Sequence, residues 1–215
     1  MSTHTILIVL VSLLLGGVSG YGIAQKDTWH NLHRGSQTQH DSVPTGMHRM
    51  PDGSLMGDSD ADMEHMNHMM DMMVESERAF IEGMIPHHQE AVDTAKEVIA
   101  RGATTPEIRA LVEDIVTAQE REITTMKQWY QDWYGTPYRD TGEYMPMMRE
   151  LESLSGSALD KTFLTDMIIH HMGAIMMAHS VQPYIEHEQI ATLTTAIVST
   201  QAAEIAERRR LLRGL

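Results

Sequence analysis

Apolar side chains recur every three or four residues from about residue 60 to the end of the chain, which is the spacing of one helix face. The first stripe predicts one long helix over residues 60–99. Pro86 lies within this helix and should kink it, because proline lacks the N–H of a helix hydrogen bond. Gly102 is expected to end it. The stripe consists of Met63, Met66, Met70, Met73, Phe80, Met84, His87 and Ala91.

Three further helices follow from the same spacing. The second is predicted to start after Thr105 as its N-cap and to end at Tyr134. Ser157 is the expected N-cap of the third helix, which should reach about residue 182, and the fourth is predicted over residues 189–212. The predicted buried stripe of the second helix is Leu111, Val112, Ile115, Gln119, Glu122, Met126, Trp129 and Trp133. The end of the fourth carries Arg208, Arg209, Arg210 and Arg213, as suits a helix C-terminus.

One phrase occurs twice, at residues 80–88 and at residues 163–171. Both copies place a Met three residues before a His-His pair, and the helices that follow align after a shift of 82 positions. Each repeat is therefore predicted to be a helical hairpin, and two hairpins make an all-α four-helix bundle. No segment alternates like a strand. The aligned residues are Ile115, Val116, Gln119, Glu122 and Ile123 with Ile197, Val198, Gln201, Glu204 and Ile205.

Composition adds a chemical bias. The 215 residues include 19 Met and 13 His but no Cys, so disulfides and thiolate metal sites are excluded, whereas thioether and imidazole donors are abundant. These donors suit soft and borderline metals, Cu(I) above all, and thioethers do not form disulfides in an oxidising compartment. The formal net charge of -14 argues against a nucleic-acid partner and fits the attraction of cations.

The N-terminal region divides into two parts. Residues 1–24 hold an uncharged apolar run followed by small residues, which is typical of a secretory signal peptide, although no Lys or Arg precedes the run. An uncleaved membrane anchor is the alternative. Residues 25–58 are polar and interrupted by Gly and Pro, and they are predicted to be a Met/His-containing linker. The bundle domain is assigned to residues 59–215, with a Met/His-rich helix extension over residues 59–74.

At these motifs the chain resembles a known family. The phrase Met-Ile-Pro-His-His-Gln-Glu-Ala-Val, its second version ending in Met-Met-Ala-His, and the Gln-x-x-Glu-Ile of the partner helices are similar to the ferritin-like domain-of-unknown-function family 305. The resemblance covers roughly residues 75–210. Residues 47–56 and 144–148 resemble stretches of its exported, Met/His-rich, CopM-type members. The resemblance implies a ferritin-like bundle with a periplasmic copper-binding role in metal tolerance.

The two His-His pairs supply the first candidate ligands, because a Met and a His at i and i+3 share one helix face. These candidates are Met84, His87, His88, Met167, His170 and His171. The residues expected behind them are Glu122, Glu204, Gln119 and Gln201. The alternative is purely structural: His87 and His170 would then pair with the buried carboxylates of the partner helices and bind no metal.

The repeats differ on one outer face of the first and third helices. The second copy has Met172, Met176 and His179 where the first has Gln89, Asp93 and Lys96. Because the fold should act alike on both copies, this exchange favours a metal site, and the bundle is not expected to depend on these three side chains. The alternative is a second apolar face, which Ile168 and Ile175 on the same side support.

Two other clusters gather soft donors. The predicted helix extension carries His65, Met66, His68 and Met69, and the connection between the repeats carries Met145, Met147 and Met148. Packing does not require Met on every side of a helix, and a loop has little packing reason to hold three. Both clusters are therefore predicted to capture soft metal.

Together these patterns predict an exported copper-binding protein. It should bind Cu(I), and Ag(I) as well, for sequestration, tolerance or handover to a copper exporter or chaperone. Its expected location is periplasmic or extracytoplasmic, with the N-terminal segment as an alternative membrane tether; the oligomeric state is left open. Two other classes remain open: a metal-free structural or interaction bundle, and a ferritin-like redox enzyme using Glu122, Glu204, His87 and His170. The enzyme is less favoured, because no His follows a Glu by three positions.

Overall fold

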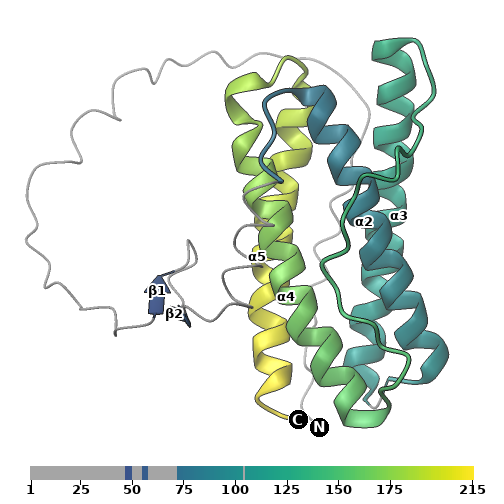
Figure 1. Ribbon diagram of the computed structural model, residues 1–215, viewed down its shortest axis with the longest axis vertical. Coiled ribbons are helices and arrows are strands. Elements are labelled where there is room, and N and C mark those ends of the chain that lie inside the picture. Colours follow the sequence, from purple (N-terminus) through teal and green to yellow (C-terminus); the bar gives the residue numbers. More distant parts are fainter. Residues whose placement is uncertain (1–46, 50–54, 58–71, 104) are drawn as a thin grey trace, which may run out of the picture. The chain divides into compact units, whose positions relative to one another are not determined.

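The computed structural model describes residues 47–49, 55–57, 72–103 and 105–215, and four long helices dominate this part of the chain (Figure 1). In chain order its elements are β1 (Met47–Arg49), β2 (Leu55–Gly57), α2 (Glu77–Arg101), α3 (Pro106–Tyr134), α4 (Gly156–Ser180), the 3-10 helix η1 (Gln182–Tyr184) and α5 (Glu188–Leu212). The all-α class and the four-helix bundle are confirmed. The predicted signal peptide or anchor over residues 1–24 lies outside the described residues.

The strands β1 and β2 form a small antiparallel hairpin within the segment predicted as a linker. Met47 lies opposite Gly57, and Arg49 lies opposite Leu55. No strand is expected from the sequence, because no segment alternates, so this hairpin was not predicted. Each strand has only three residues, which is too short for the alternation of apolar and polar positions that identifies strands in a sequence.

Helix α2 begins at Glu77, so the prediction of one continuous helix over residues 60–99 is wrong at residues 72–76. The preceding residues 72–76 are not helical. Ser76 has extended backbone angles, and its side chain accepts a hydrogen bond from the Ala79 N–H at 3.0 Å, so it acts as an N-cap. The helix then runs through Pro86 to Arg101. Residues 58–71, where the extension was predicted, lie outside the described residues.

The other helix ends follow local chemistry closely. Gly102 and Gly135 end α2 and α3 with positive φ angles of 83° and 70°, and Thr105 caps α3 through the Ile108 N–H. Helix α4 starts after Ser155 rather than after the predicted cap Ser157. On α3, the predicted stripe is confirmed: Val112, Ile115, Gln119 and Met126 are buried, and Leu111, Glu122, Trp129 and Trp133 are half-buried.

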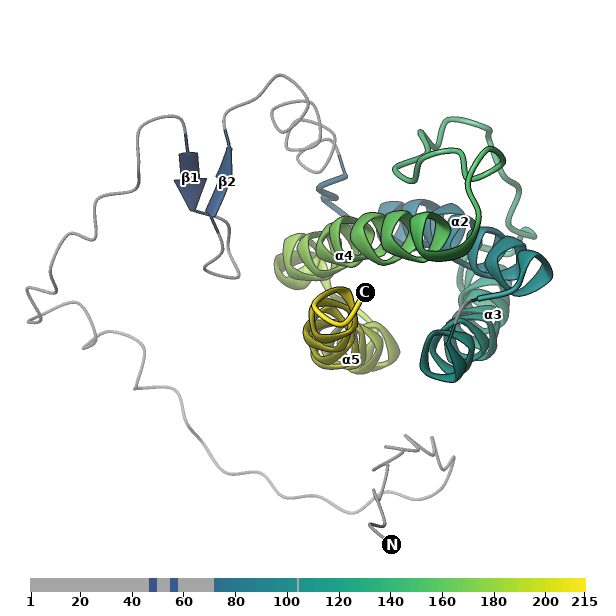
Figure 2. The ribbon, with the colours of Figure 1, turned by 90° about the horizontal axis from the view of Figure 1, so that it is seen from below.

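The helices form two hairpins that meet through one helix of each. Helix α3 packs against α2, α5 packs against α4, and α2 packs against α4. Figure 2 shows α2 and α4 side by side, with α3 and α5 on the same side of the layer that they make. The contact between α2 and α4 therefore holds the two repeats together.

Two apolar clusters fill the interior, one toward each end of the antiparallel α2 and α4. The first joins the start of α2, including Phe80 and Met84, to the end of α4, including Met177. The second joins the end of α2 to the start of α4, including Phe163 and Met167. Both His-His pairs fall between the clusters along their helices. The middle of the bundle is therefore a polar layer of four histidines.

Candidate metal centre

Four histidine side chains lie in the middle of α2 and α4, and all four are fully shielded from solvent. His87, His88, His170 and His171 each have 0% exposed surface. The rings of His87 and His170 face each other across the contact between α2 and α4, with centroids 3.7 Å apart and planes inclined by 33°. The same residue of each repeat thus meets its counterpart, as expected when two similar hairpins pack about an approximate two-fold axis.

The second histidine of each pair turns to the partner helix of its own hairpin. His88 Nε2 lies 2.8 Å from Glu122 Oε2, and His171 Nε2 lies 2.5 Å from Glu204 Oε2. The expectation that His87 and His170 lie opposite these carboxylates is therefore wrong. Consecutive residues on a helix point about 100° apart. Consequently the first histidine of each pair faces the other repeat, and the second faces the partner helix of its own repeat.

His170 has polar partners that the sequence did not indicate. Its Nε2 lies 3.1 Å from the His87 carbonyl oxygen and 3.3 Å from Glu90 Oε2. Glu90 also accepts hydrogen bonds from the Tyr144 hydroxyl at 2.5 Å and from the backbone N–H groups of Met147 and Met148 at 2.8 Å each. One carboxylate therefore fixes a core histidine and the connection between the repeats.

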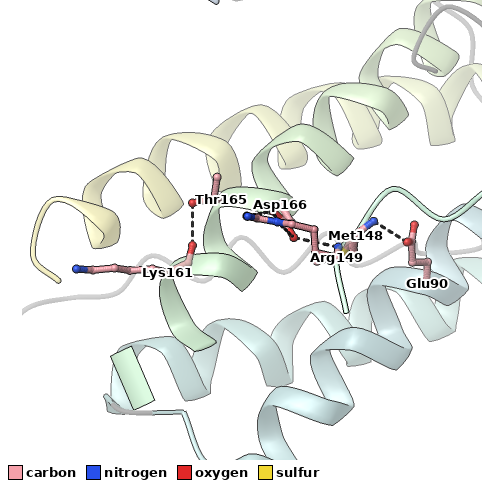
Figure 3. Close-up of polar contacts among 6 residues, drawn as sticks. All are labelled: Glu90, Met148, Arg149, Lys161, Thr165 and Asp166. Carbon is pink, nitrogen blue, oxygen red and sulfur yellow. Dashed lines mark hydrogen bonds and ion pairs between the residues drawn. The ribbon is translucent and has the colours of Figure 1, made fainter. Parts of the chain in front are cut away.

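The connection between α3 and α4 is bonded to the two central helices by two carboxylates, Glu90 of α2 and Asp166 of α4. Figure 3 shows Glu90 reaching the Met148 backbone and Asp166 reaching Arg149. Arg149 donates to both carboxylate oxygens of Asp166, which is only 6% exposed, and its backbone N–H donates there too. The methionines of the connection are thereby held close to α2 and α4.

His87 differs from the other three histidines. Within the described residues, neither its Nδ1 nor its Nε2 has a hydrogen-bond partner. Desolvation by burial, helped by the neighbouring His170, His88 and His171, lowers the pKa of His87 well below the usual range and outweighs the opposing effect of the His170 backbone. The ring is therefore neutral at pH 7, with one nitrogen lone pair free to bind a cation.

Burial keeps His170 and His171 neutral as well. Desolvation lowers the pKa of His170, although Glu90 opposes the shift, and it lowers the pKa of His171 to about 3. Desolvation would raise the pKa of Glu204, but His171 and Arg208 outweigh it and bring that pKa to about 2. A neutral His171 thus donates its Nε2–H to an ionised Glu204.

Arg208 is a buried cation, although its place near the end of the fourth helix predicts an ordinary charge at a helix C-terminus. Its exposed fraction is 0%, and its Nη2 donates to Glu204 Oε2 at 3.1 Å. The shift of 82 positions that aligns the partner helices sets Arg208 against Met126, so this alignment could have revealed the difference. In the second repeat, Glu204 is therefore paired with the guanidinium of Arg208. In the first repeat, the position aligned with Arg208 is Met126, which carries no charge.

The remaining candidates of the repeat motif lie in different surroundings. Met84 and Met167 have 0% exposed surface and belong to the two separate apolar clusters. Gln119 and Gln201 are buried, and their side-chain oxygens have no hydrogen-bond partner among the described residues. The structure thus brings the histidines together but not the two methionines.

The line of Met172, Met176 and His179 runs from the interior to the surface. Met172 is 7% exposed and packs in a third apolar cluster with Met147 and Ile205, whereas Met176 is half-buried and His179 is exposed. The packing of Met172 argues against the expectation that the bundle does not depend on this side chain, because it fills apolar space between elements.

The other predicted soft donors are spread between surface, interior and undescribed segments. Met145 is 66% exposed, Met147 is 8% exposed, and Met148 is half-buried. His65, Met66, His68 and Met69 lie outside the described residues. In the part of the chain that the structure describes, no group of three or more His, Asp and Glu side chains is placed to hold a metal ion.

No helix among the described residues is long and apolar enough to cross a membrane. The predicted membrane anchor falls within residues 1–24 and so lies outside this statement.

The chain belongs to the family described as "Domain of unknown function (DUF305)". The family model matches residues 21–130 and residues 77–212, which confirms the resemblance seen in the repeated motifs. No curated protein matches the chain in sequence.

Solved structures of similar proteins include copper-bound and silver-bound forms of one protein. CopM in its Cu(II)-bound form is 33% identical, covers 66% of this chain and 99% of its own, and has a TM-score of 0.60. The Cu(I)-bound form is 33% identical, covers 66% of this chain and 98% of its own, and has a TM-score of 0.60. A silver-bound form has the same identity and the same coverages, with a TM-score of 0.59. A candidate secreted DUF305 protein from Streptomyces coelicolor is 27% identical, with coverages of 65% and 93% and a TM-score of 0.58.

Proposed function

We propose that this protein binds copper as Cu(I), and silver as Ag(I), through methionine and histidine side chains. The observation that carries the proposal is the 33% identity to CopM over 66% of this chain, because CopM has been solved with Cu(I), Cu(II) and silver. The donor chemistry of the chain agrees: it has 19 Met and 13 His and lacks Cys.

The side chains in the described region support soft rather than hard metal chemistry. Within that region the half-buried carboxylates near the histidines already have partners, since Glu122 holds His88, Glu204 holds His171 and Glu90 holds His170. The thioethers carry no charge and compete poorly for Zn(II) or Mg(II). We therefore assign metal binding to Met and neutral His, with the solvent-accessible donors Met145, Met176 and His179 as points of capture. His65, Met66, His68 and Met69 would add a capture segment ahead of the bundle.

We further propose that the protein works outside the cytoplasm, in sequestration, tolerance or handover of the metal. The signal-like sequence of residues 1–24 and the use of thioethers in place of thiols support this location. A copper exporter or chaperone would be the partner for handover. Binding and release would then proceed by ligand exchange among Met and His, without any bond-making step in a substrate.

Competition with a chromogenic Cu(I) chelator tests the proposal. Purified apo-protein should withdraw Cu(I) from the chelator and bind Ag(I), while Zn(II) should bind much more weakly. Protein that binds Zn(II) but leaves Cu(I) with the chelator would contradict the proposed function. Metal analysis of protein exported by copper-supplemented cells provides a second measurement, and copper should exceed zinc in that sample.

A further inference from the structure

The two repeats are related by an approximate two-fold axis, and they differ at one position next to the paired histidines. His87 corresponds to His170, and the residue three positions after each is Glu90 in α2 and Gly173 in α4. Glu90 reaches across the helix contact to His170, with 3.3 Å between its Oε2 and the ring Nε2. The corresponding position opposite His87 is Gly173, which has no side chain. His170 therefore has a carboxylate beside it, whereas His87 has none at the equivalent position.

A thioether occupies the side of Gly173 where a side chain would be. A Cβ atom at position 173 would lie 3.4 Å from His87 Nε2 and 3.3 Å from Met72 Sδ. The imidazole nitrogen and the sulfur thus both border the space that the missing side chain leaves. His87 is 0% exposed, and within the described residues neither ring nitrogen has a hydrogen-bond partner. A buried ring nitrogen without a hydrogen-bond partner, next to the same glycine as a thioether sulfur, is an arrangement that packing alone does not require.

Met72 also links this space to a cavity. The cavity has a volume of about 380 Å³, and its lining includes Met72, Gly83, Pro86, Tyr144, Met145 and Met177. Met145 is 66% exposed, whereas Met177 is 2% exposed and has its sulfur 3.5 Å from where a Cβ on Gly83 would lie. Three methionines from separate segments thus border one cavity, and one of them, Met72, also borders the space between Gly173 and His87. Met145 is the exposed member of the three.

We propose that His87 Nε2 and Met72 Sδ are two ligands of a Cu(I) or Ag(I) site beside Gly173, with further thioethers supplied from the cavity by Met145 and Met177. This inference rests on the proposed function and locates one of its binding sites. An uncharged imidazole with thioethers and no carboxylate is a donor set for a soft monovalent ion rather than for Zn(II) or iron. Gly173 is needed because any larger residue would enter the space between the two donors.

Silver titration followed by NMR of the imidazole nitrogens tests the site directly, since Ag(I) is diamagnetic. In the wild-type protein, the first equivalents of Ag(I) should shift the His87 Nε2 resonance. In Met72→Leu, which keeps the volume and removes the sulfur, that resonance should stay in place. The Cu(I) affinity of Met72→Leu in chelator competition should fall about tenfold or more. Met126→Leu is the matched control, because Met126 is fully buried on α3, and it should bind as wild type does.

Gly173→Ala provides an independent variant that keeps both donors. Its new methyl group should close the space between them and weaken Cu(I) binding while helicity stays unchanged. If Met72→Leu and Gly173→Ala both keep wild-type affinity and a wild-type His87 shift, the site lies elsewhere and this inference is wrong, although the protein still binds copper. If the wild-type protein binds neither Cu(I) nor Ag(I), the proposed function itself fails, and this inference fails with it.

Discussion

At the scale of single residues, the main feature is that two adjacent histidines serve different neighbours. His87 and His170 meet across the contact between the repeats, whereas His88 and His171 are held by carboxylates of their own hairpins. The two carboxylates differ as well, because Glu204 also neutralises the buried Arg208. Similar sequence motifs have therefore acquired different electrostatic roles in the two repeats.

The two carboxylates should contribute unequally to stability. Glu204→Gln leaves the fully buried guanidinium of Arg208 without its counter-charge, which should cost about 3–5 kcal/mol of unfolding free energy. Glu122→Gln removes only a charged partner of a buried histidine and should cost about 1 kcal/mol. Urea denaturation of the two variants, followed by circular dichroism, measures both values. Equal losses would show that Arg208 does not depend on Glu204.

Acid should destabilise the apo-protein well above the pH range in which its carboxylates titrate. The folded pKa of His171 is about 3, below the ordinary 6.5, so the unfolded chain binds a proton that the folded chain rejects. Stability is therefore complete above pH 6.5 and is lost as the pH falls from there toward 3. Between pH 7 and pH 5, His171 alone should account for roughly 2 kcal/mol.

Urea denaturation at the two pH values, with a metal chelator present, measures this loss. Glu204 does not contribute in this window, because its folded pKa is about 2 and its stabilising effect is lost only at lower pH. His171→Gln should reduce the difference between pH 7 and pH 5, since glutamine does not titrate. An apo-protein as stable at pH 5 as at pH 7 would contradict the buried, neutral state of these histidines.

The sequence indicates that buried histidines meet carboxylates of the partner helices, but not which histidine pairs with which carboxylate. Both members of a His-His pair lie near the inner face of the helix, and the crossing of the helices decides which one faces the partner. Glu90 was missed because it reads as an ordinary polar residue on an outer face. Comparison with Gly173 of the second repeat is the signal that could have identified it.

At the scale of elements, helix boundaries follow from capping residues more reliably than from apolar stripes. Gly102 and Thr105 give the ends predicted from their chemistry. The start of α2 was misplaced because the methionines before Glu77 continue the spacing of the helix, while Ser76 interrupts its backbone. Spacing reports which residues share a face if a helix exists, but the cap determines where it begins.

Two serines that precede helices allow a matched test of this point. Ser76 accepts a hydrogen bond from the Ala79 N–H, whereas Ser155 makes no side-chain cap bond at the start of α4. Ser76→Ala should therefore lower the unfolding free energy by about 1 kcal/mol, and Ser155→Ala should have almost no effect. Thermal melting of both variants distinguishes them. A larger loss at Ser155 would mean that the caps are assigned to the wrong serine.

The outer face of α4 should divide between packing and surface chemistry. Met172 is 7% exposed, so Met172→Gln buries an amide among apolar side chains and should cost about 1–3 kcal/mol. His179 is exposed, and His179→Lys should change stability by less than about 0.5 kcal/mol. Chemical denaturation of the two single variants is the measurement. An unfolding free energy unchanged in Met172→Gln would support the expectation that the bundle does not depend on this side chain.

At the scale of the whole molecule, two similar hairpins are joined through α2 and α4, and four histidines occupy the middle of that joint. The internal repeat predicts this architecture, because two copies of a hairpin bury their apolar faces by pairing. It does not predict the candidate site beside Gly173, which arises where the copies differ. A repeat explains the shared fold, and the positions that depart from it show where the two halves have specialised.

Binding at a site formed only in the folded protein should raise the melting temperature. Met72 precedes α2, His87 lies within it, and the space between their donors is left by Gly173 of α4, so the unfolded chain lacks this arrangement. Cu(I) buffered at about 100 times its dissociation constant should add about 2.7 kcal/mol to the unfolding free energy. For a domain of this size that corresponds to a rise of roughly 5–10 °C. Differential scanning calorimetry under anaerobic conditions measures the rise, with Zn(II) as the ion that should leave the melting temperature nearly unchanged. Met72→Leu should lose most of the rise while Met126→Leu keeps it; an equal rise in both variants would place the stabilising ion somewhere other than beside His87.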